Sequence, residues 1–338
     1  MRHSRRCFIG LAAAGLPAIA SLRAAAAFAA GGRSNSAIDG VRLGVQTYSF
    51  RDMLGTPGDM TDKTIAAMQE LGLTECEVFE PTVQPPALSA NAPWRMAAGG
   101  KPTKASLLGH MPTGAPSAAD LASREAVRKW RLGEGLEQVR AAGEKFKRAG
   151  IRVQAFNFLL KDSCTDEEIE RGLLMTRAMN TNLMTASTTL SMARRSIPFF
   201  EKHDLLLAVH GHSNLSDPNQ FATPESFVQA LAMSPRYRVN LDIGHYSACG
   251  FDSVAFIRAH HDRITNLHIK DRKNNDGSNM PFGQGDTPIK AVLQLLKNER
   301  YPIPADIEYE YAGTGSSTQE LAKCLQYVRS ALALRPAV

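Results

Sequence analysis

The sequence lacks the short motifs that identify several common enzyme classes. No GxGxxG turn and no Walker sequence follows the first strand-like segment, so the usual phosphate-binding loops of nucleotide enzymes are absent. Cysteine is sparse, and none of the five residues has a CxxC or other metal-ligand spacing. Cys7 lies in a leader-like segment, and we expect the other four, Cys76, Cys164, Cys249 and Cys324, to be buried free thiols.

Outside the N-terminal segment, the chain also has little net positive charge. The whole chain has a formal net charge of +6, but residues 1–30 contain four arginines and no acidic residue, so the remainder has +2. No stripe of Lys and Arg is present, which argues against nucleic acid as a partner. The hydrophobic share of 43% and the charged share of 21% are ordinary for a soluble globular protein.

The N-terminus lacks the uninterrupted run of roughly 20 apolar residues that a membrane anchor needs. Residues 1–30 instead have a basic start, a short apolar stretch interrupted by Arg23, and several alanines suited to cleavage, which together predict a signal peptide without a stable membrane anchor. Ser4-Arg5-Arg6-Cys7-Phe8-Ile9 matches the twin-arginine export consensus. We therefore expect the twin-arginine translocase as a partner and a periplasmic or secreted location.

Strand-like and helix-like segments alternate after a short linker at residues 31–40. Eight short β-rich runs are predicted as strands: Leu43–Ser49, Glu75–Phe79, Arg152–Phe156, Leu183–Ala186, Leu205–His210, Val239–Asp242, Ile264–Ile269 and Asp306–Tyr309. Helical patterning lies between and after them, at Met60–Leu71, Glu134–Ala149, Asp166–Met179, Pro224–Met233, Asp252–His260, Pro288–Leu296 and Thr318–Leu332. Eight alternations favour a closed (β/α)8 TIM barrel, of class α/β, over residues 41–336 rather than an open doubly wound sheet.

Local patterns add two expectations. Thr165 with Glu168, and Ser317 with Glu320, are spaced as capping boxes that open two of the helices. Residues 81–123, rich in Pro, Gly and Ala, are predicted as an insertion after the second strand. At that position the insertion emerges at the carboxyl-terminal mouth of a barrel, as a lid over substrate or as a mobile segment.

Polar residues end the late strands, where apolar residues are otherwise expected. His210 and His212 end the fifth strand, Asp242 the sixth, His268 the seventh and Glu308 the eighth. A single His or acidic residue at such a place is often structural, as a hydrogen-bonding or capping group. Four successive strands ending this way predict a ring of nitrogen and oxygen ligands for a divalent cation, because unpaired buried polar groups are costly.

The chain resembles the sugar phosphate isomerase/epimerase superfamily, the xylose-isomerase-like TIM barrels, over roughly residues 41–334. The motifs that carry the resemblance are Gly44-Val45-Gln46-Thr47-Tyr48-Ser49-Phe50, Glu77-Val78-Phe79-Glu80, Asp242-Ile243-Gly244-His245, His268-Ile269-Lys270-Asp271, Gly283-Gln284-Gly285-Asp286 and Ile307-Glu308. The resemblance implies one divalent metal ion (Mn, Zn, Mg or Co) held by His210, Asp242, His268 and Glu308. It also implies that His245 contacts substrate hydroxyls.

One position departs from the pattern of the epimerases in this superfamily. They have Glu on both the fifth and the eighth strand, and the two carboxylates exchange a proton on opposite faces of the substrate. Here His210 stands on the fifth strand. The superfamily also includes dehydratases and lyases that eliminate water or an alcohol next to a carbonyl. The candidates for acid and base are His212, His245, Lys270, Glu310 and Glu77.

The leading hypothesis is a metal-dependent isomerase or epimerase that abstracts a proton beside the carbonyl of a sugar or keto-sugar. No Gly-rich anion loop or Arg cluster is evident, which favours an unphosphorylated carbohydrate as the small-molecule substrate. The alternatives are a lyase or dehydratase acting on a 3-keto-glycoside or inosose, and a non-catalytic carbohydrate-binding barrel. A nuclease of the related barrel class is disfavoured by the charge of +2 and by export, and a homo-oligomer is left open.

Overall fold

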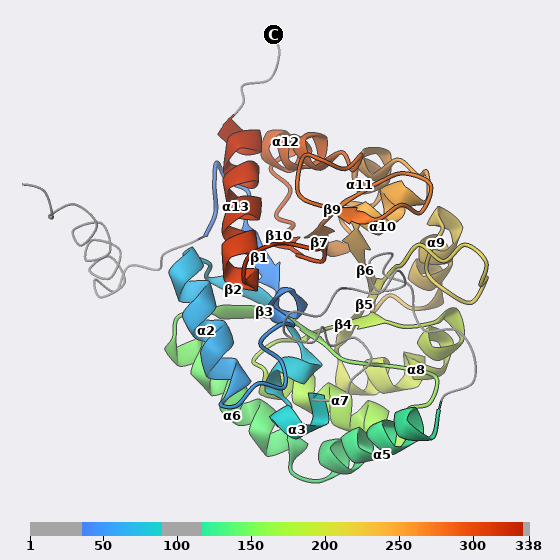
Figure 1. The fold of residues 1–338 in the computed structure, drawn as a ribbon. Helices are drawn as coiled ribbons and strands as arrows, with labels where there is room; N and C mark the ends of the chain where they lie inside the picture. The colour runs from blue at the N-terminus through green and yellow to red at the C-terminus, as the bar shows by residue number, and fades with distance from the viewer. Residues whose placement is uncertain (1–35, 90–116, 334–338) are drawn as a thin grey trace, which may run out of the picture. The chain divides into compact units, whose positions relative to one another are not determined.

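Eight parallel strands close into a barrel with helices around it (Figure 1), as predicted. The computed structural model describes residues 36–89 and 117–333, so the predicted signal peptide and the first half of the linker lie outside the described residues. The order around the barrel is β1-β10-β7-β6-β5-β4-β3-β2. The strands are β1 (Leu43–Gln46), β2 (Glu75–Phe79), β3 (Arg152–Asn157), β4 (Leu183–Ser187), β5 (Leu206–His210), β6 (Tyr237–Asp242), β7 (Ile264–Ile269) and β10 (Ala305–Ile307).

The helices cover the outer face of the barrel. They are α2 (Met60–Leu71), α5 (Ala118–Leu132), α6 (Gly135–Arg148), α7 (Asp166–Ala178), α8 (Leu190–His203), α9 (Pro224–Met233), α10 (Ile243–Ala248), α11 (Ser253–His260), α12 (Ile289–Glu299) and α13 (Ser317–Ala333). Helix α2 shows how local sequence sets the bounds. The Asp59 side chain accepts from the backbone N–H groups of Thr61 and Asp62, and Gly72 ends the helix at a φ of 70°, which favours glycine.

The first and last barrel strands differ from their predicted bounds. Strand β1 ends at Gln46, and a 3-10 helix, η1 (Thr47–Phe50), follows it. The Gln46 side chain caps this turn by accepting a hydrogen bond from the backbone N–H of Tyr48. Strand β10 is displaced towards the N-terminus, at Ala305–Ile307. Glu308 therefore lies just beyond its strand.

The capping-box predictions had different outcomes. The Thr165–Glu168 box is present at the start of α7 and is confirmed. The Ser317–Glu320 box is wrong, because Glu320 instead accepts from the Gly315 N–H and from the Tyr311 hydroxyl. The reciprocal pair forms one residue earlier. There the Gln319 N–H donates to Ser316, and the Ser316 N–H donates to the Gln319 side chain.

The predicted insertion at residues 81–123 is not a continuous loop in its described parts. A 3-10 helix, η2 (Glu80–Val83), and a short helix, α3 (Pro86–Ser89), follow β2. Helix α5 then begins at Ala118, behind a capping box formed by Ser117 and Asp120. The remainder of the insertion, residues 90–116, lies outside the described residues, so its predicted roles stay predictions.

Helix α5 is anchored to the barrel by a buried ion-pair network. The Arg131 guanidinium donates to both carboxylate oxygens of Glu80, at 2.7 and 2.6 Å, and to Glu168 at 3.0 Å. It also lies over the Phe158 ring, 4.1 Å from the centroid. Arg128, one turn earlier, donates to the other Glu168 oxygen. Paired charges replace a continuous apolar stripe on this helix, whose buried residues are Trp130 and Arg131.

The apolar core lies mainly between the strands and the helices, while much of the barrel interior is polar. A separate small apolar cluster of Ala155, Leu183 and Ala208 lies below the polar residues. Side chains alternate across a strand, so these three face the same way as Asn157, Thr185 and His210, each two residues further on. The interior thus changes from apolar to polar towards the carboxyl-terminal mouth.

The four cysteines of the described residues were predicted to be buried free thiols. Cys76, Cys164, Cys249 and Cys324 are free, as predicted, although Cys249 is partly exposed rather than buried. Among the described helices, none is both long and apolar enough to cross a lipid bilayer.

Candidate metal centre

Successive side chains of a β-strand point to opposite faces of the sheet, so every second residue of a barrel strand faces the interior. On three neighbouring strands, these interior positions carry the polar residues of the centre. In β6 and just after it the interior-facing polar residues are Asn240 and Asp242; in and after β7 they are Asn266, His268 and Lys270; in and after β10 they are Asp306, Glu308 and Glu310. The strand register places Asp242 beside His268, and His268 beside Asp306. Strand β5 adds His210 at its last position.

The four predicted ligands all present buried nitrogen or oxygen atoms that make no hydrogen bond, although three of these atoms take part in close ion pairs. The four atoms are His210 Nδ1, Asp242 Oδ2, His268 Nδ1 and Glu308 Oε2. Ligand atoms of His210, Asp242 and His268 all lie within 4.8 Å of one another, and a second group of the same kind joins His210 to His212 and His245. Of the four atoms, only His210 Nδ1 has neither a hydrogen bond nor an ion pair among the described residues, and leaving a buried polar atom unpaired is costly. A shared divalent cation would pair it and would bind the other three atoms as well.

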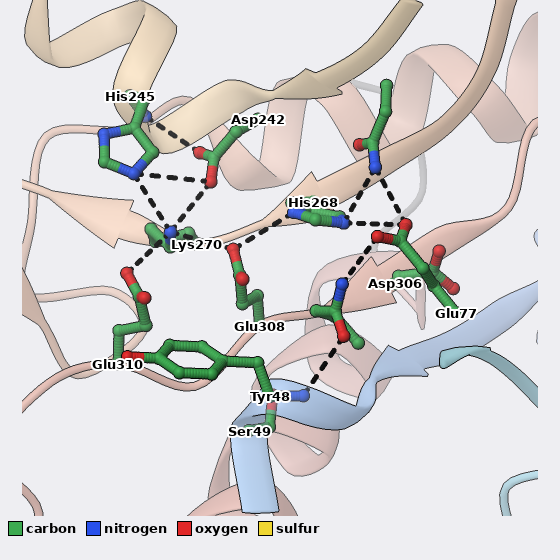
Figure 2. Close-up of polar contacts among 12 residues, drawn as sticks. Tyr48, Ser49, Glu77, Asp242, His245, His268, Lys270, Asp306, Glu308 and Glu310 are labelled. Carbon is green, nitrogen blue, oxygen red and sulfur yellow. Dashed lines mark hydrogen bonds and ion pairs between the residues drawn. The ribbon is translucent and has the colours of Figure 1, made fainter. Parts of the chain in front are cut away.

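The ammonium of Lys270 lies among the carboxylates of this centre (Figure 2). Its Nζ is 2.8 Å from Asp242 Oδ2, 2.8 Å from Glu308 Oε2 and 2.7 Å from Glu310 Oε2. Burial alone would lower the pKa of Lys270, but these three carboxylates raise it above its usual range. Lys270 is therefore charged, and the carboxylates already attract a cation to this place.

Glu77 lies at the floor of the centre and holds the His268 ring. Its Oε2 is 2.9 Å from His268 Nε2, and the other ring nitrogen, Nδ1, lies 3.1 Å from Glu308 Oε2. Burial would lower the pKa of His268, but the carboxylates of Glu308 and Glu77 raise it well above its usual range. Because Nε2 faces Glu77, only Nδ1 is directed towards the other candidate ligands.

The Glu77 carboxylate already accepts as many hydrogen bonds as its oxygens can hold. This environment does not suit a general base, which is one of the roles that the sequence suggested for Glu77. Three donors reach each oxygen, and they come from five other strands: Gln46, Asn157 and Thr185 donate to Oε1, and Asn240, Asn266 and His268 to Oε2. Burial would raise the pKa of Glu77, but His268 and the Thr185 hydroxyl lower it. The geometry therefore fits a carboxylate that orients a ligand.

The two histidines that end β5 differ in their contacts. His210 is buried, and burial together with the charge of His268 lowers its pKa to about 4. His212 is half-buried, and within the described residues its ring makes no hydrogen bond, although it packs against the rings of His210 and His245 at 5.0 Å each. Burial and then His210 lower the pKa of His212 well below its usual range. Both rings are therefore neutral at pH 7.

His245 lies between two cationic side chains. Its Nδ1 is 2.6 Å from Arg272 Nη1, and its Nε2 is 3.2 Å from Lys270 Nζ and 3.9 Å from Asp242 Oδ2. Burial, and then Lys270 and Arg272, lower the pKa of His245 well below its usual range. The backbone N–H of His245 donates to Asp242 Oδ1, so α10 begins on a candidate ligand.

The structure therefore brings together all nine residues that the sequence singled out: His210, His212, Asp242, His245, His268, Lys270, Glu308 and Glu310 around the mouth, and Glu77 beneath them. Sequence reasoning missed Arg272, which lies one residue beyond a quoted motif, and the interior layer of Asn240, Asn266 and Asp306. The signal for that layer was present, because each of these three polar residues precedes a predicted ligand by two positions.

The residues present fit a divalent cation. Two imidazoles and two carboxylates offer mixed nitrogen and oxygen donors, and each has a buried atom that lacks a hydrogen bond. A carboxylate, Glu77, lies behind one imidazole, as is usual for histidine ligands of metals. The donor set does not distinguish Mn, Zn, Mg and Co.

Comparison with known sequences supports the resemblance in the second half of the chain. Residues 188–330 match the family described as "Xylose isomerase-like TIM barrel". L-ribulose-5-phosphate 3-epimerase UlaE of Escherichia coli is 29% identical over 100 residues, which are 30% of this chain and 35% of the epimerase. The match therefore spans about a third of that relative.

Solved structures share the fold over most of the chain. The probable 3-DHS dehydratase AsbF of Bacillus anthracis superposes with a TM-score of 0.56 at 13% identity, covering 84% of this chain and 98% of that one. The IolI protein, solved with a bound zinc atom, superposes with a TM-score of 0.55 at 12% identity, covering 86% and 98%. At these identities the likeness shows the fold, a xylose-isomerase-like TIM barrel.

Proposed function

We propose that this protein is a divalent-metal-dependent enzyme of the isomerase/epimerase type, acting on an unphosphorylated sugar or keto-sugar. The observation that carries the proposal is the convergence of four buried candidate ligand atoms, of which His210 Nδ1 is unpaired, beside a neutral imidazole, His212, at the barrel mouth. The likeness to an epimerase and to the fold of a dehydratase supports the same class of chemistry.

In this proposal His210, Asp242, His268 and Glu308 hold the ion. Bound there, a divalent cation supplies Lewis-acid polarisation of a carbonyl oxygen. Glu77 fixes the orientation of the His268 ring, so that Nδ1 faces the other ligands. Lys270 keeps its contact with Glu310 at 2.7 Å, which holds its ammonium at the edge of the site as a donor to substrate oxygens.

His212 is the proposed general base. A neutral ring that makes no hydrogen bond within the described residues can accept a proton from the carbon beside a carbonyl. Glu310, held by Lys270 and by the Asn279 amide at 3.3 Å, is the carboxylate available for proton return on a second side. Return of the proton to carbon gives isomerisation or epimerisation.

One observation favours a second candidate, a lyase acting by α,β-elimination. The fifth strand ends in His210 rather than in a carboxylate, so the centre offers no symmetrical pair of glutamates. A single base is sufficient for elimination. His212 takes the α-proton, the leaving oxygen departs with the bonding electrons of its carbon, and protonated His212 returns the proton to that oxygen.

The test combines metal analysis with proton exchange. Purified protein is analysed for bound metal and then incubated in deuterated water with a panel of unphosphorylated sugars and 3-keto-glycosides, followed by NMR. Deuterium incorporation with the carbon skeleton retained supports the isomerase or epimerase, and release of water or an aglycone supports the lyase. Absence of both, with metal and sugar bound, leaves a non-catalytic carbohydrate-binding barrel and overturns the proposal.

Three variants separate the roles. Asp242→Ala and Glu308→Ala should lose metal and turnover together. His212→Gln should keep the metal and lose exchange, because its ring is no ligand in this proposal. The matched control is His261→Gln, an exposed histidine whose ring contacts that of Tyr301, which should retain both properties. Wild-type metal content and activity in both the Asp242 and the Glu308 variants would sink the ligand assignment.

We also propose export through the twin-arginine pathway, from Arg5 and Arg6 in the leader-like segment. Replacement of both by lysine should leave the protein in the cytoplasm of a host that has this pathway. Fractionation with an immunoblot measures the distribution, and unchanged export of the double variant would refute the pathway.

A further inference from the structure

Arg272 is fully buried beside the metal centre, and the loop around it is built to hold it. It lies in β8 (Asp271–Arg272), which pairs with β9 (Asn279–Met280) in a two-stranded sheet after β7. Its guanidinium donates to the Gly277 carbonyl from Nε at 3.0 Å and from Nη2 at 2.7 Å, and to the Ser213 hydroxyl at 2.8 Å. Asp276 neutralises it at 3.2 Å. Nη1, which donates to Ser213, has a second N–H, and this one faces His245.

That contact determines which nitrogen of His245 can carry a proton. Arg272 Nη1 lies 2.6 Å from His245 Nδ1. A guanidinium has five N–H donors and no acceptor, so a contact this short requires a lone pair on Nδ1. The single proton of the neutral ring is then on Nε2, which faces the candidate metal ligands and Lys270.

We propose that Arg272 is a positioning residue that locks His245 as the Nε2–H tautomer, so that His245 acts only as a hydrogen-bond donor to a substrate oxygen. This inference rests on the proposed function for the identity of that oxygen, the carbonyl or hydroxyl oxygen of a sugar. It removes His245 from the candidate bases, since Nε2 has no lone pair to offer. It also removes it from the candidate acids, because loss of the Nε2 proton would leave an imidazolate.

The surroundings of Nε2 fit an acceptor atom of a ligand. His245 Nε2 lies 3.2 Å from Lys270 Nζ and 3.9 Å from Asp242 Oδ2. The three N–H groups of the ammonium are taken up by carboxylate oxygens of Asp242, Glu308 and Glu310 at 2.7–2.8 Å, so the contact with Lys270 does not require a lone pair on Nε2. With a proton on Nε2, the imidazole and the ammonium are two donors side by side. A substrate oxygen that gains negative charge as the neighbouring carbon loses its proton would accept from both. A neutral imidazole fixed as a donor is suited to this role, because it stabilises the developing charge without transferring a proton. Proton transfer is then left to His212.

The experiment measures the tautomer of His245 directly and does not require enzymatic activity. Protein with ¹⁵N-labelled histidine is studied by long-range ¹H–¹⁵N NMR, metal-free and loaded with diamagnetic Zn²⁺, and the His245 signals are assigned by their loss in His245→Gln. We expect a pyridine-like shift for Nδ1 and a pyrrole-like shift for Nε2 in both states. A pyrrole-like Nδ1 in the wild-type protein overturns the proposal without any variant.

Substitutions of Arg272 then test the cause. Arg272→Met removes every donor, so the pyrrole-like signal should move from Nε2 towards Nδ1, which can donate to Ser213 Oγ at 3.4 Å. Arg272→Lys restores a group that only donates and should restore the wild-type pattern. Arg258→Met is the matched control, because this exposed arginine pairs with Glu299 away from the centre. A folded Arg272→Met protein with the wild-type tautomer would refute the role of Arg272.

The outcomes also separate this inference from the proposed function. If His245 is fixed as the Nε2–H tautomer but the protein converts no sugar, the inference about Arg272 stands and the proposed enzymatic function is refuted. If the protein is an active enzyme but His245 is protonated on Nδ1, or its tautomer does not change when Arg272 is replaced, the proposed function stands and the inference about Arg272 is refuted.

Discussion

Glu77 Oε2 lies 2.9 Å from His268 Nε2, so a carboxylate on β2 holds the ring of a candidate ligand on β7. The pair connects strands that are not neighbours in the barrel. It leaves His268 Nδ1 as the nitrogen that faces Glu308. The orientation of the candidate ligand is therefore set from beneath it, by a residue that does not approach the mouth.

Replacing Glu77 with Gln should weaken metal binding about 10- to 100-fold, as loss of an orienting partner typically does. The four proposed ligands remain, so the stoichiometry should stay the same. Isothermal titration with Zn²⁺ or Mn²⁺ measures both quantities. Glu75→Gln is the control, since Glu75 lies on the same strand and pairs with Arg42. Equal affinities for the two variants would contradict the orienting role of Glu77.

Replacing Lys270 with Met should make the protein more dependent on its metal. The ammonium is the cation shared by Asp242, Glu308 and Glu310. Removing one partner from a buried ion-pair group costs about 3–5 kcal/mol, so the metal-free variant should unfold at lower temperature. Added metal should restore more stability than in the wild type, because Lys270 no longer competes for the carboxylates.

Thermal unfolding of the Lys270 variant with and without metal measures this difference. Lys297→Met serves as the control, because Lys297 pairs with Asp39 outside the centre. A metal-induced rise in Tm no larger than in the wild type would argue against Lys270 and the ion sharing ligands.

Replacing Glu80 with Gln should release helix α5. Both Glu80 oxygens accept from Arg131, and neither side chain is more than 5% exposed. Breaking a buried pair leaves an uncompensated charge, at a cost of about 3–5 kcal/mol. Hydrogen exchange should show faster exchange across residues 118–132 than in the wild type. Exchange confined to other helices would show that the ion pair does not anchor α5.

Stability should fall in acid partly through Glu168. Burial would raise the pKa of Glu168, but the Thr165 N–H, Arg128 and Arg131 lower it. A carboxylate whose pKa is lower when folded stabilises the protein above its unfolded pKa of about 4.3, and this stabilisation is lost as the pH falls through the folded value. Wild type and Glu168→Gln should therefore differ most in unfolding free energy near neutral pH and converge in acid. A constant difference from pH 7 to pH 3 would contradict this assignment.

The barrel and the ring of candidate ligands could be predicted because they depend on periodicity. Eight alternations specify a closed barrel, and parallel strands bring their carboxyl ends to one mouth, so His210, Asp242, His268 and Glu308 had to gather there. No contact distance is needed for that argument.

What could not be predicted depends on partners far apart in the chain. Helix α5 has too few apolar residues for a helical hydrophobic pattern to predict it. Its buried face is completed by Arg131, which pairs with the carboxylates of Glu80 and Glu168, 51 and 37 residues away in the sequence. The surroundings of Glu77 could not be predicted for the same reason. An acidic residue on a strand suggests a base, and only the six donors around it show that it is an acceptor already in use.

The polar floor also has a consequence for how the barrel opens. The Glu77 carboxylate accepts hydrogen bonds from side chains on β1, β3, β4, β6 and β7. If any one of these strands separates from the barrel, the buried carboxylate loses a hydrogen bond that water does not replace, which is costly. Fluctuations that would fray an apolar barrel strand by strand are thereby coupled. The centre of this barrel opens as one cooperative unit, and slow hydrogen exchange should extend evenly around it.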